Sequence, residues 1–303
     1  MAPDELFLGV DGGGTRCRAR LYDACGHPLG EAVSGPANLN HGLNEAFASV
    51  FDAVFRSLAQ AQLVPSDFPR ITACLALAGA TEPAAEAAAR LQRQGFARAI
   101  LTSDAHAACV GAHDGADGGI IIVGTGSIGF AVRNGRQHRV GGWGLQVSDE
   151  GSGAWIGREV LRRVLMAYDG RLKWTPLLRG AFDRYEGAPH RMVQTSGRAT
   201  PRDFGRIAPL VFEHAAQGDD VALAIVHAAA HHIDGIAYRL TELGVVRLSL
   251  AGGVAPHLQP FLSASIRQRL VDPIGDALDG AFLLARAAAD APAVSAQIPG
   301  DAA

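Results

Sequence analysis

The chain has 303 residues, of which 48% are hydrophobic and 19% charged, and its formal net charge at pH 7 is −3. This length predicts about two domains, and the composition is that of a globular chain with a sizeable core. The scattered basic residues give no electrostatic footprint for nucleic acid, and no apolar run approaches the roughly 20 residues of a spanning helix. We therefore expect a cytoplasmic protein with neither a nucleic-acid nor a membrane partner.

The first predicted elements are two strands, at residues 6–10 and 17–22, on either side of a glycine loop. Gly12, Gly13 and Gly14 form this loop, and glycine is tolerated where the backbone takes a positive φ or approaches a neighbour closely. Such a loop with bare N–H groups is an anion site. A tight hairpin turn without a ligand is an equally good interpretation of the loop alone.

The rest of the N-terminal third predicts alternating strands and helices. A strand at 29–34 precedes a helix at 44–62, and "ITACLALAGA" is a buried strand. Thr81 and Pro83 predict the start of the next helix, which leads to the strand "AILTSD" and the helix "AHAACVGAH". The Gly/Asp-rich stretch "DGADGG" then indicates a domain boundary, so the first domain is expected at 1–115.

The strand, glycine loop and strand recur at 119–132, followed by a type I′ turn at Asn134-Gly135. The region 153–243 reads as mostly helical, and "VRLSLAGGVA" reads as a strand that ends in glycines. A last helix at about 279–289 is expected to pack back on the first domain, and residues 290–303 read as a disordered tail. The repeat predicts a second, similar domain at 116–278, with both glycine loops pointing into a shared cleft.

Neither the cysteines nor a histidine pair shows the spacing of a metal site. The cysteines form no CxxC pair and are expected as buried free thiols; they are Cys17, Cys25, Cys74 and Cys109. His227 and His231 lie four apart on a predicted helix, but the glutamate of an HExxH motif is missing. Helix packing and solvent exposure account for both histidines.

Three glycine motifs, each after an apolar strand, resemble those of the actin-like ATPase superfamily. "DGGGT" (11–15) is similar to its first phosphate motif, "GTGS" (124–127) to its second, and "LAGGV" (250–254) to its adenosine motif. "SDAHAA" (103–108) and "GGWGLQVSDEGSGAWIG" (141–157) are similar to the BadF/BadG/BcrA/BcrD ATPase family, specifically its glucosamine and N-acetylglucosamine kinases. The resemblance implies an α/β fold of two actin-like (ribonuclease H-like) domains, with a nucleotide and sugar cleft between them.

Phosphoryl transfer needs positioning and charge neutralisation, which backbone N–H groups and a metal ion supply. The resemblance implies ATP and Mg²⁺ as cofactors. Asp11, at a strand end, would fix hydrated Mg²⁺, although a turn-capping aspartate is the alternative. The nucleotide-binding residues would be Gly12, Gly13, Gly14, Thr15, Gly124, Thr125, Gly126, Ser127, Gly252 and Gly253.

For the sugar, the resemblance makes Asp104 the base that accepts the hydroxyl proton, although an N-cap of the following helix is also open to it. Asp149 and Glu150 would bind sugar hydroxyls. Asn38 matches the sugar-binding asparagine of the family, but Asn40 is close enough to leave that assignment open. The implied sugar contacts also include Gly79 and Gly126.

Two positions depart from the family pattern and bear on the substrate. Ala78 stands where relatives with N-acetyl substrates place a serine, and Ser148 replaces the glycine expected before Asp-Glu. Because an amine at C2 is a cation that favours carboxylates, we expect a kinase of the 6-hydroxyl of glucosamine. The alternative is an N-acetylglucosamine kinase.

A different class within the family is an ATPase activator of 2-hydroxyacyl-CoA dehydratases, which holds an iron–sulfur cluster between two subunits. That function needs cysteine ligands from the middle of the chain, and no cysteine follows Cys109. By resemblance the protein is also expected to be a homodimer, with an amino sugar and ATP as its small-molecule partners.

Overall fold

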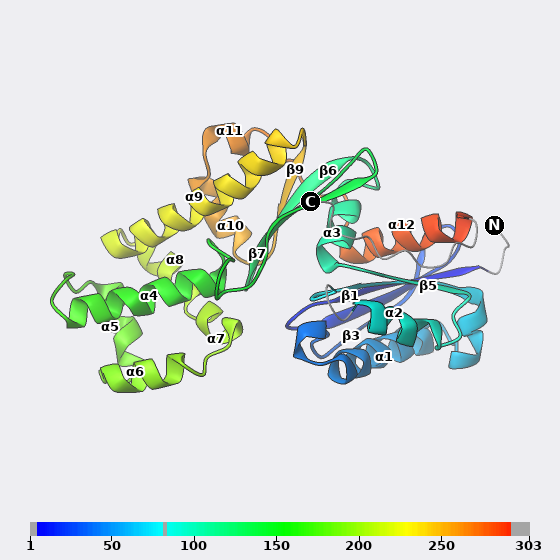
Figure 1. The fold of residues 1–303 in the computed structure, drawn as a ribbon, viewed down its shortest axis with the longest axis horizontal. Helices are drawn as coiled ribbons and strands as arrows, with labels where there is room; N and C mark the ends of the chain where they lie inside the picture. Colours follow the sequence, from blue (N-terminus) through cyan, green and yellow to red (C-terminus); the bar gives the residue numbers. More distant parts are fainter. Residues whose placement is uncertain (1–4, 81–83, 292–303) are drawn as a thin grey trace. The chain divides into compact units, whose positions relative to one another are not determined.

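The computed structural model describes residues 5–80 and 84–291 (Figure 1). The predicted helix start at Thr81 and Pro83, and most of the predicted tail, lie outside these residues. The chain divides into two compact units: the first holds residues 1–118, 134–137 and 273–303, and the second holds 119–133 and 138–272. The boundaries predicted from the sequence are at 115 and 278.

The first unit is built on a five-stranded sheet in the order β3-β2-β1-β4-β5. Strands β1 and β2 pair antiparallel, as do β2 and β3, whereas β1, β4 and β5 run parallel. The predicted strands are therefore confirmed, with bounds Leu6–Gly12 (β1), Cys17–Tyr22 (β2), Pro28–Ser34 (β3), Ile71–Leu77 (β4) and Arg98–Thr102 (β5).

Helices cover both faces of this sheet. Side chains alternate between the two faces of a strand, so Leu8 and Val10 of β1 share one core cluster while Phe7 belongs to another. The first cluster includes residues of α1 (Leu43–Gln60) and α2 (Ala84–Gln92), and the second includes residues of α3 (Asp104–Ala112) and α12 (Ala277–Asp290). Short 3₁₀ helices occur at Leu39–His41 (η1) and Pro65–Arg70 (η2).

A glycine in β1 lets α12 approach the sheet closely. A Cβ at Gly9 would lie 2.8 Å from the carbonyl oxygen of Leu278. Phe282 of the same helix packs its ring edge against Phe7, with the ring centroids 5.6 Å apart. The C-terminal helix thus belongs to the core of the first unit.

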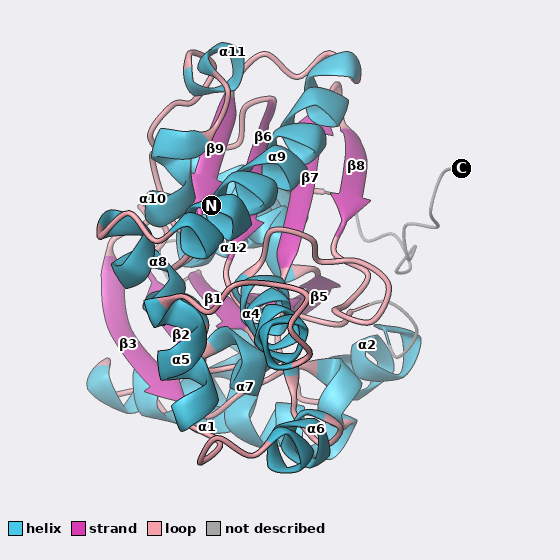
Figure 2. Ribbon diagram, turned by 90° about the vertical axis from the view of Figure 1, so that its left-hand side faces the viewer, coloured by secondary structure: helices cyan, strands magenta, loops and turns pink. Residues whose placement is uncertain are grey.

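The second unit has a four-stranded sheet in the order β8-β7-β6-β9, drawn in magenta in Figure 2. At the β7–β8 turn, Asn134 and Gly135 have φ of +49° and +71°, so the predicted type I′ turn is confirmed. The strands are Gly118–Val123 (β6), Ser127–Arg133 (β7), Arg136–Gly141 (β8) and Leu248–Ala251 (β9).

Helices make up most of the remainder of this unit and share one hydrophobic core with the sheet. They are Gly153–Tyr168 (α4), Pro176–Asp183 (α5), Pro189–Ser196 (α6), Pro201–Gly205 (α7), Ala208–Ala216 (α8), Asp220–Glu242 (α9), Ala255–Leu258 (α10), Ala264–Arg267 (α11) and the 3₁₀ helix Gln259–Phe261 (η3).

Helix α9 is the single helix of the described residues that is long and apolar enough to cross a membrane. Ten of its residues, from Val221 to Leu240, are buried in the unit. It also packs against β7, as Figures 1 and 2 both show. Its apolar composition is therefore explained by burial in the protein core.

The prediction of buried cysteines is confirmed at three positions and wrong at Cys25. Cys17, Cys74 and Cys109 are buried, whereas Cys25 is exposed. The difference arises because Cys25 lies in the short turn between β2 and β3, outside the core. His227 packs edge-on against Phe261, at 5.2 Å between ring centroids, as expected of a packing residue.

Candidate active site

In the first unit, three predicted site residues lie at or just beyond the carboxyl ends of neighbouring parallel strands. The register pairs Gly12 of β1 with Leu77 of β4, and β5 continues the parallel set. Asp11 is the penultimate residue of β1, Gly79 lies two residues beyond β4, and Asp104 lies two residues beyond β5. The carboxyl ends of parallel strands form the edge at which open α/β sheets bind ligands.

The glycines of the first phosphate motif have different tasks. A Cβ at Gly12 would lie 2.5 Å from Leu77 Cδ2, so this glycine is required by packing within the chain. The N–H of Gly13 donates to the carbonyl of Arg16 at 3.0 Å, which corrects the expectation that its N–H is bare. Gly14, Thr15 and Arg16 are exposed, so this part of the loop is accessible.

Asp11 is bound by an arginine on the adjacent strand. Arg18 donates from Nη2 and Nε to the Oδ2 atom of Asp11, at 2.8 and 3.2 Å, and from Nη1 to Asp276 at 2.7 Å. Asp11 is therefore a residue of strand β1, paired with Arg18 of β2, and is not the cap of a turn. Because both bonds use one oxygen and the side chain is 23% exposed, the carboxylate also suits Mg²⁺, which keeps most of its waters.

Asn38 lies between the phosphate loop and Gly79. Its Oδ1 accepts the N–H of Asn40 at 2.9 Å, which caps η1, and it is 2.6 Å from the position of a Cβ on Gly79. Its Nδ2 lies 3.9 Å from the position of a Cβ on Gly14. Asn40 Oδ1 lies 2.8 Å from the same Cβ position on Gly79, so both asparagines border this glycine, Asn38 half-buried and Asn40 exposed.

Ser103, and not Asp104, caps helix α3. The Ser103 hydroxyl accepts the N–H of His106 at 3.1 Å, while Asp104 is the first helical residue and accepts the N–H of Ala105 at 2.9 Å. The N-cap alternative for Asp104 is therefore wrong by one position. In the same turn, burial lowers the pKa of His106 to about 4, and its Nδ1 lies 2.7 Å from Thr102 Oγ1.

In the second unit, the second phosphate motif and the adenosine motif follow two parallel strands, β6 and β9, and meet at one edge. The N–H of Gly124 donates to the carbonyl of Gly126 at 2.9 Å, so this N–H is used within the loop. The start of α4 holds the loop from behind, because Gly153 donates to the carbonyl of Gly124 at 2.8 Å and Ala154 to that of Thr125 at 3.1 Å.

The two glycines of the adenosine motif also differ. Gly252 has a φ of +96°, and a Cβ there would overlap the carbonyl oxygen of Val123. At Gly253 no atom lies within 4 Å of the position of a Cβ. The chain itself therefore requires glycine at 252, whereas position 253 borders open space.

That space is part of a cavity of about 380 Å³. The stacked rings of Phe212 and His257, with centroids 4.5 Å apart and planes inclined by 14°, form part of its wall. Sequence reasoning missed these aromatic residues because no local motif marks them, and α8 and α10 are brought together only by the fold. The full lining is Gly205, Ala208, Pro209, Phe212, Glu213, Gly253, Val254 and His257.

Asp149 is held in a left-handed backbone conformation, with φ of +61°. Its Oδ1 accepts the N–H of Gly144 at 3.1 Å, and its Oδ2 is 2.8 Å from the position of a Cβ on Gly126. Burial raises the pKa of Asp149, while the Gly144 bond lowers it; the charge of Glu150 raises it and that of Arg139 lowers it. The carboxylate therefore lies beside the second phosphate motif.

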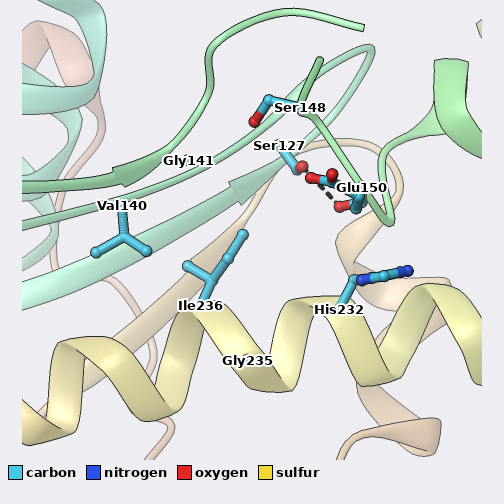
Figure 3. A pocket seen from close by; sticks show the side chains of 8 residues that line it. All are labelled: Ser127, Val140, Gly141, Ser148, Glu150, His232, Gly235 and Ile236. Carbon is cyan, nitrogen blue, oxygen red and sulfur yellow. Dashed lines mark hydrogen bonds between the residues drawn. The ribbon is translucent and has the colours of Figure 1, made fainter. Parts of the chain in front are cut away.

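Glu150 lines a second cavity of about 220 Å³, shown in Figure 3. The Ser127 hydroxyl donates to the Glu150 carbonyl at 2.8 Å, which joins the start of β7 to the loop that carries both acids. Helix α9 forms the opposite wall of the cavity. Its lining comprises Ser127, Val140, Gly141, Ser148, Glu150, His232, Gly235 and Ile236.

Comparison with known proteins gives consistent results. The model of the BadF/BadG/BcrA/BcrD ATPase family matches residues 8–285. Glucosamine kinase GspK of Vibrio cholerae is 40% identical over 281 residues, which cover 93% of this chain and 96% of that protein. An N-acetylmuramic acid/N-acetylglucosamine kinase of Clostridium acetobutylicum is 27% identical over 94% of this chain and 100% of that protein. A solved structure from Chromobacterium violaceum, described as a candidate N-acetylglucosamine kinase, is 37% identical with a TM-score of 0.86, covering 93% and 100%.

Proposed function

Because the chain belongs to the BadF/BadG/BcrA/BcrD ATPase family, we propose that it is an ATP-dependent kinase that phosphorylates the 6-hydroxyl of glucosamine. The observation that carries this proposal is the meeting of Asp11, Asn38, Gly79 and Asp104 at the carboxyl edge of one parallel sheet. That edge combines a phosphate loop with a carboxylate suited to act as a base. The identity to GspK supports the choice of an amino sugar.

The nucleotide is assigned to the glycine loops of both units. In the first unit, Gly14 and Thr15 would bind phosphate oxygens through their backbone N–H groups. In the second, Gly253 borders the cavity with the Phe212 and His257 rings, which suits an adenine base. Asp11 would hold hydrated Mg²⁺, which, when bound, neutralises charge on the phosphates.

Asp104 is assigned as the general base. As the sugar O6 forms a bond to the γ-phosphorus, the bond from that phosphorus to the β–γ bridging oxygen breaks and ADP leaves. The O6 proton passes to the Asp104 carboxylate. Since Ser103 supplies the helix cap, Asp104 lies in the first turn of α3 without that structural task.

The preference for a free amine rests on residues of both units that the family resemblance assigns to the sugar. Ala78 carries no hydroxyl with which to bond an acetamido group. Asp149 and Glu150 bring two carboxylates to the second unit, and carboxylates favour an ammonium group. A homodimeric, cytoplasmic enzyme remains our expectation.

The test is a coupled ADP-release assay over a panel of sugars that includes glucosamine, N-acetylglucosamine, N-acetylmuramic acid and glucose. We expect kcat/KM for glucosamine to exceed that for N-acetylglucosamine by at least ~10-fold, about 1.4 kcal/mol of discrimination. A preference for the acetylated sugar would reverse the substrate while keeping the reaction. A brown, iron-containing protein without sugar-dependent turnover would favour the dehydratase activator.

A further inference from the structure

Arg139, in strand β8, contacts the start of the loop that carries Asp149. Its Nε donates to the carbonyl of Gly141 at 3.1 Å, and its Nη2 donates to the carbonyl of Gly142. The guanidinium also lies over the ring of Trp143, 3.8 Å from the ring centroid. One planar cation thus holds three consecutive residues, which the fork of an arginine permits and a lysine ammonium does not.

Residues 141–143 need such support because two of them are glycines, whose backbone is flexible. Gly141 and Gly142 have φ of +71° and +75°, and consecutive glycines lose more conformational freedom on ordering than any other residues. Trp143 is 60% exposed, so packing into the core does little to fix it. The bonds from Arg139 therefore add to the restraint that strand β8 gives Gly141 and that packing against Ile128 gives Gly142.

The loop then returns to Asp149. The N–H of Ser148 donates to the carbonyl of Gly144 at 2.8 Å, and the N–H of Gly144 donates to the Asp149 carboxylate at 3.1 Å. Arg158 holds the middle of the loop by donating to the carbonyl of Leu145 at 2.6 Å. Arg139 thus contacts Gly141, Gly142 and Trp143, and the next residue along the chain, Gly144, donates to the Asp149 carboxylate.

We propose that Arg139 is a positioning residue for sugar binding, which fixes residues 141–144 so that the N–H of Gly144 orients the carboxylate of Asp149. This inference rests on the proposed function, in which Asp149 binds sugar hydroxyls. The positive charge of Arg139 also lowers the pKa of Asp149, against burial and the charge of Glu150, which raise it. Ionised carboxylates are the stronger acceptors of sugar hydroxyls.

The experiment compares Arg139→Met and Arg139→Lys with a matched control, Arg133→Met. Arg133, on β7, donates to the carbonyl of Leu243 at 2.7 Å, so it too binds a backbone carbonyl but outside the Asp149 loop. We expect Arg139→Met to raise the sugar KM by on the order of 10- to 100-fold, the scale of a misplaced binding group, with the ATP KM within about twofold. In the pH profile of kcat/KM for sugar, the acid limb of Arg139→Met should lie at higher pH than that of the wild type.

Arg139→Lys keeps the charge without the fork, so it should raise the sugar KM while its acid limb stays near that of the wild type. Arg133→Met should leave both the sugar KM and the acid limb unchanged. Hydrogen exchange provides a readout without turnover: the amides of Gly144 and Ser148 should exchange faster in Arg139→Met than in Arg133→Met. If exchange and sugar KM match the control in both Arg139 variants, the inference is wrong. Absence of sugar turnover in the wild type instead counts against the proposed function, and exchange alone then decides the role of Arg139.

Discussion

Ser103 accepts the N–H of His106 and thereby caps helix α3 one residue before Asp104, so the capping and chemical tasks fall on different side chains. This division makes the role of Asp104 testable, because its charge can be removed without losing the cap. The same division supplies a matched control in the neighbouring residue.

Asp104→Asn should fold normally and bind ATP, while kcat falls by on the order of 10²-fold or more, the usual scale for loss of a general base. Ser103→Ala should show the opposite pattern, lowering the free energy of unfolding by about 1 kcal/mol with little change in kcat. Steady-state kinetics and urea unfolding of both variants measure the two effects. Near-normal turnover of Asp104→Asn would remove this residue from the mechanism.

Valine substitutions at the two glycines of the adenosine motif should have different effects. Gly253→Val places a side chain in open space beside the cavity, so it should fold and raise the ATP KM by about 10-fold through overlap with the nucleotide. Gly252→Val should instead unfold the chain, because of the backbone overlap with Val123. Thermal unfolding and ATP titration distinguish the two. If Gly253→Val binds ATP as the wild type does, the cavity does not hold the nucleotide.

The two asparagines of the loop after β3 can be separated in the same way. Asn38→Ala should raise the sugar KM by about 10-fold, the cost of one lost hydrogen bond. Asn40→Ala should have less effect, because Asn40 is exposed. A larger effect at Asn40 in sugar-dependent kinetics would transfer the sugar contact to that residue.

We expect the burial of His106 to make the stability of the protein depend on pH. Its pKa is lowered from 6.5 to about 4 by burial, so between these values the unfolded chain binds a proton that the folded chain does not. The free energy of unfolding should therefore fall by about 3 kcal/mol as the pH drops from 6.5 to 4.

Urea unfolding between pH 6.5 and 4 measures the slope of the free energy of unfolding against pH. His106→Gln should flatten it, whereas His231→Gln, on the exposed face of α9, should leave it unchanged. An identical slope in all three proteins would show that His106 titrates normally in the folded state.

Much of the fold could be predicted from sequence because its signals are local. The apolar runs of β1 and β4, the Asn134-Gly135 turn and the amphipathic pattern of α1 each lie within about 20 residues. The purpose of individual glycines could not be predicted in this way. Gly12 and Gly252 accommodate Leu77 and Val123, which are distant in sequence, so their need for glycine is visible only in the folded chain.

The same limit applies to the candidate site. Asp11 and Asp104 stand out because they lie at or just after the ends of apolar strands. The arginine that binds Asp11 lies on the next strand, and only the strand register reveals it. The Phe212 and His257 rings come from separate helices, and the contact of Arg139 with residues 141–143 depends on the path of the loop. One-residue differences at helix ends, such as Ser103 for Asp104, come from competing caps of similar strength.

Transfer of the γ-phosphoryl group of ATP to the 6-hydroxyl of glucosamine can be tested through the identity of the product. Purified protein would be incubated with ATP, Mg²⁺ and glucosamine, and the products assigned by ³¹P–¹H correlation NMR. We expect glucosamine 6-phosphate in amounts equal to the ADP released, and its loss in Asp104→Asn. Inorganic phosphate as the sole phosphorylated product besides ADP, or a sugar phosphorylated at another position, would contradict it.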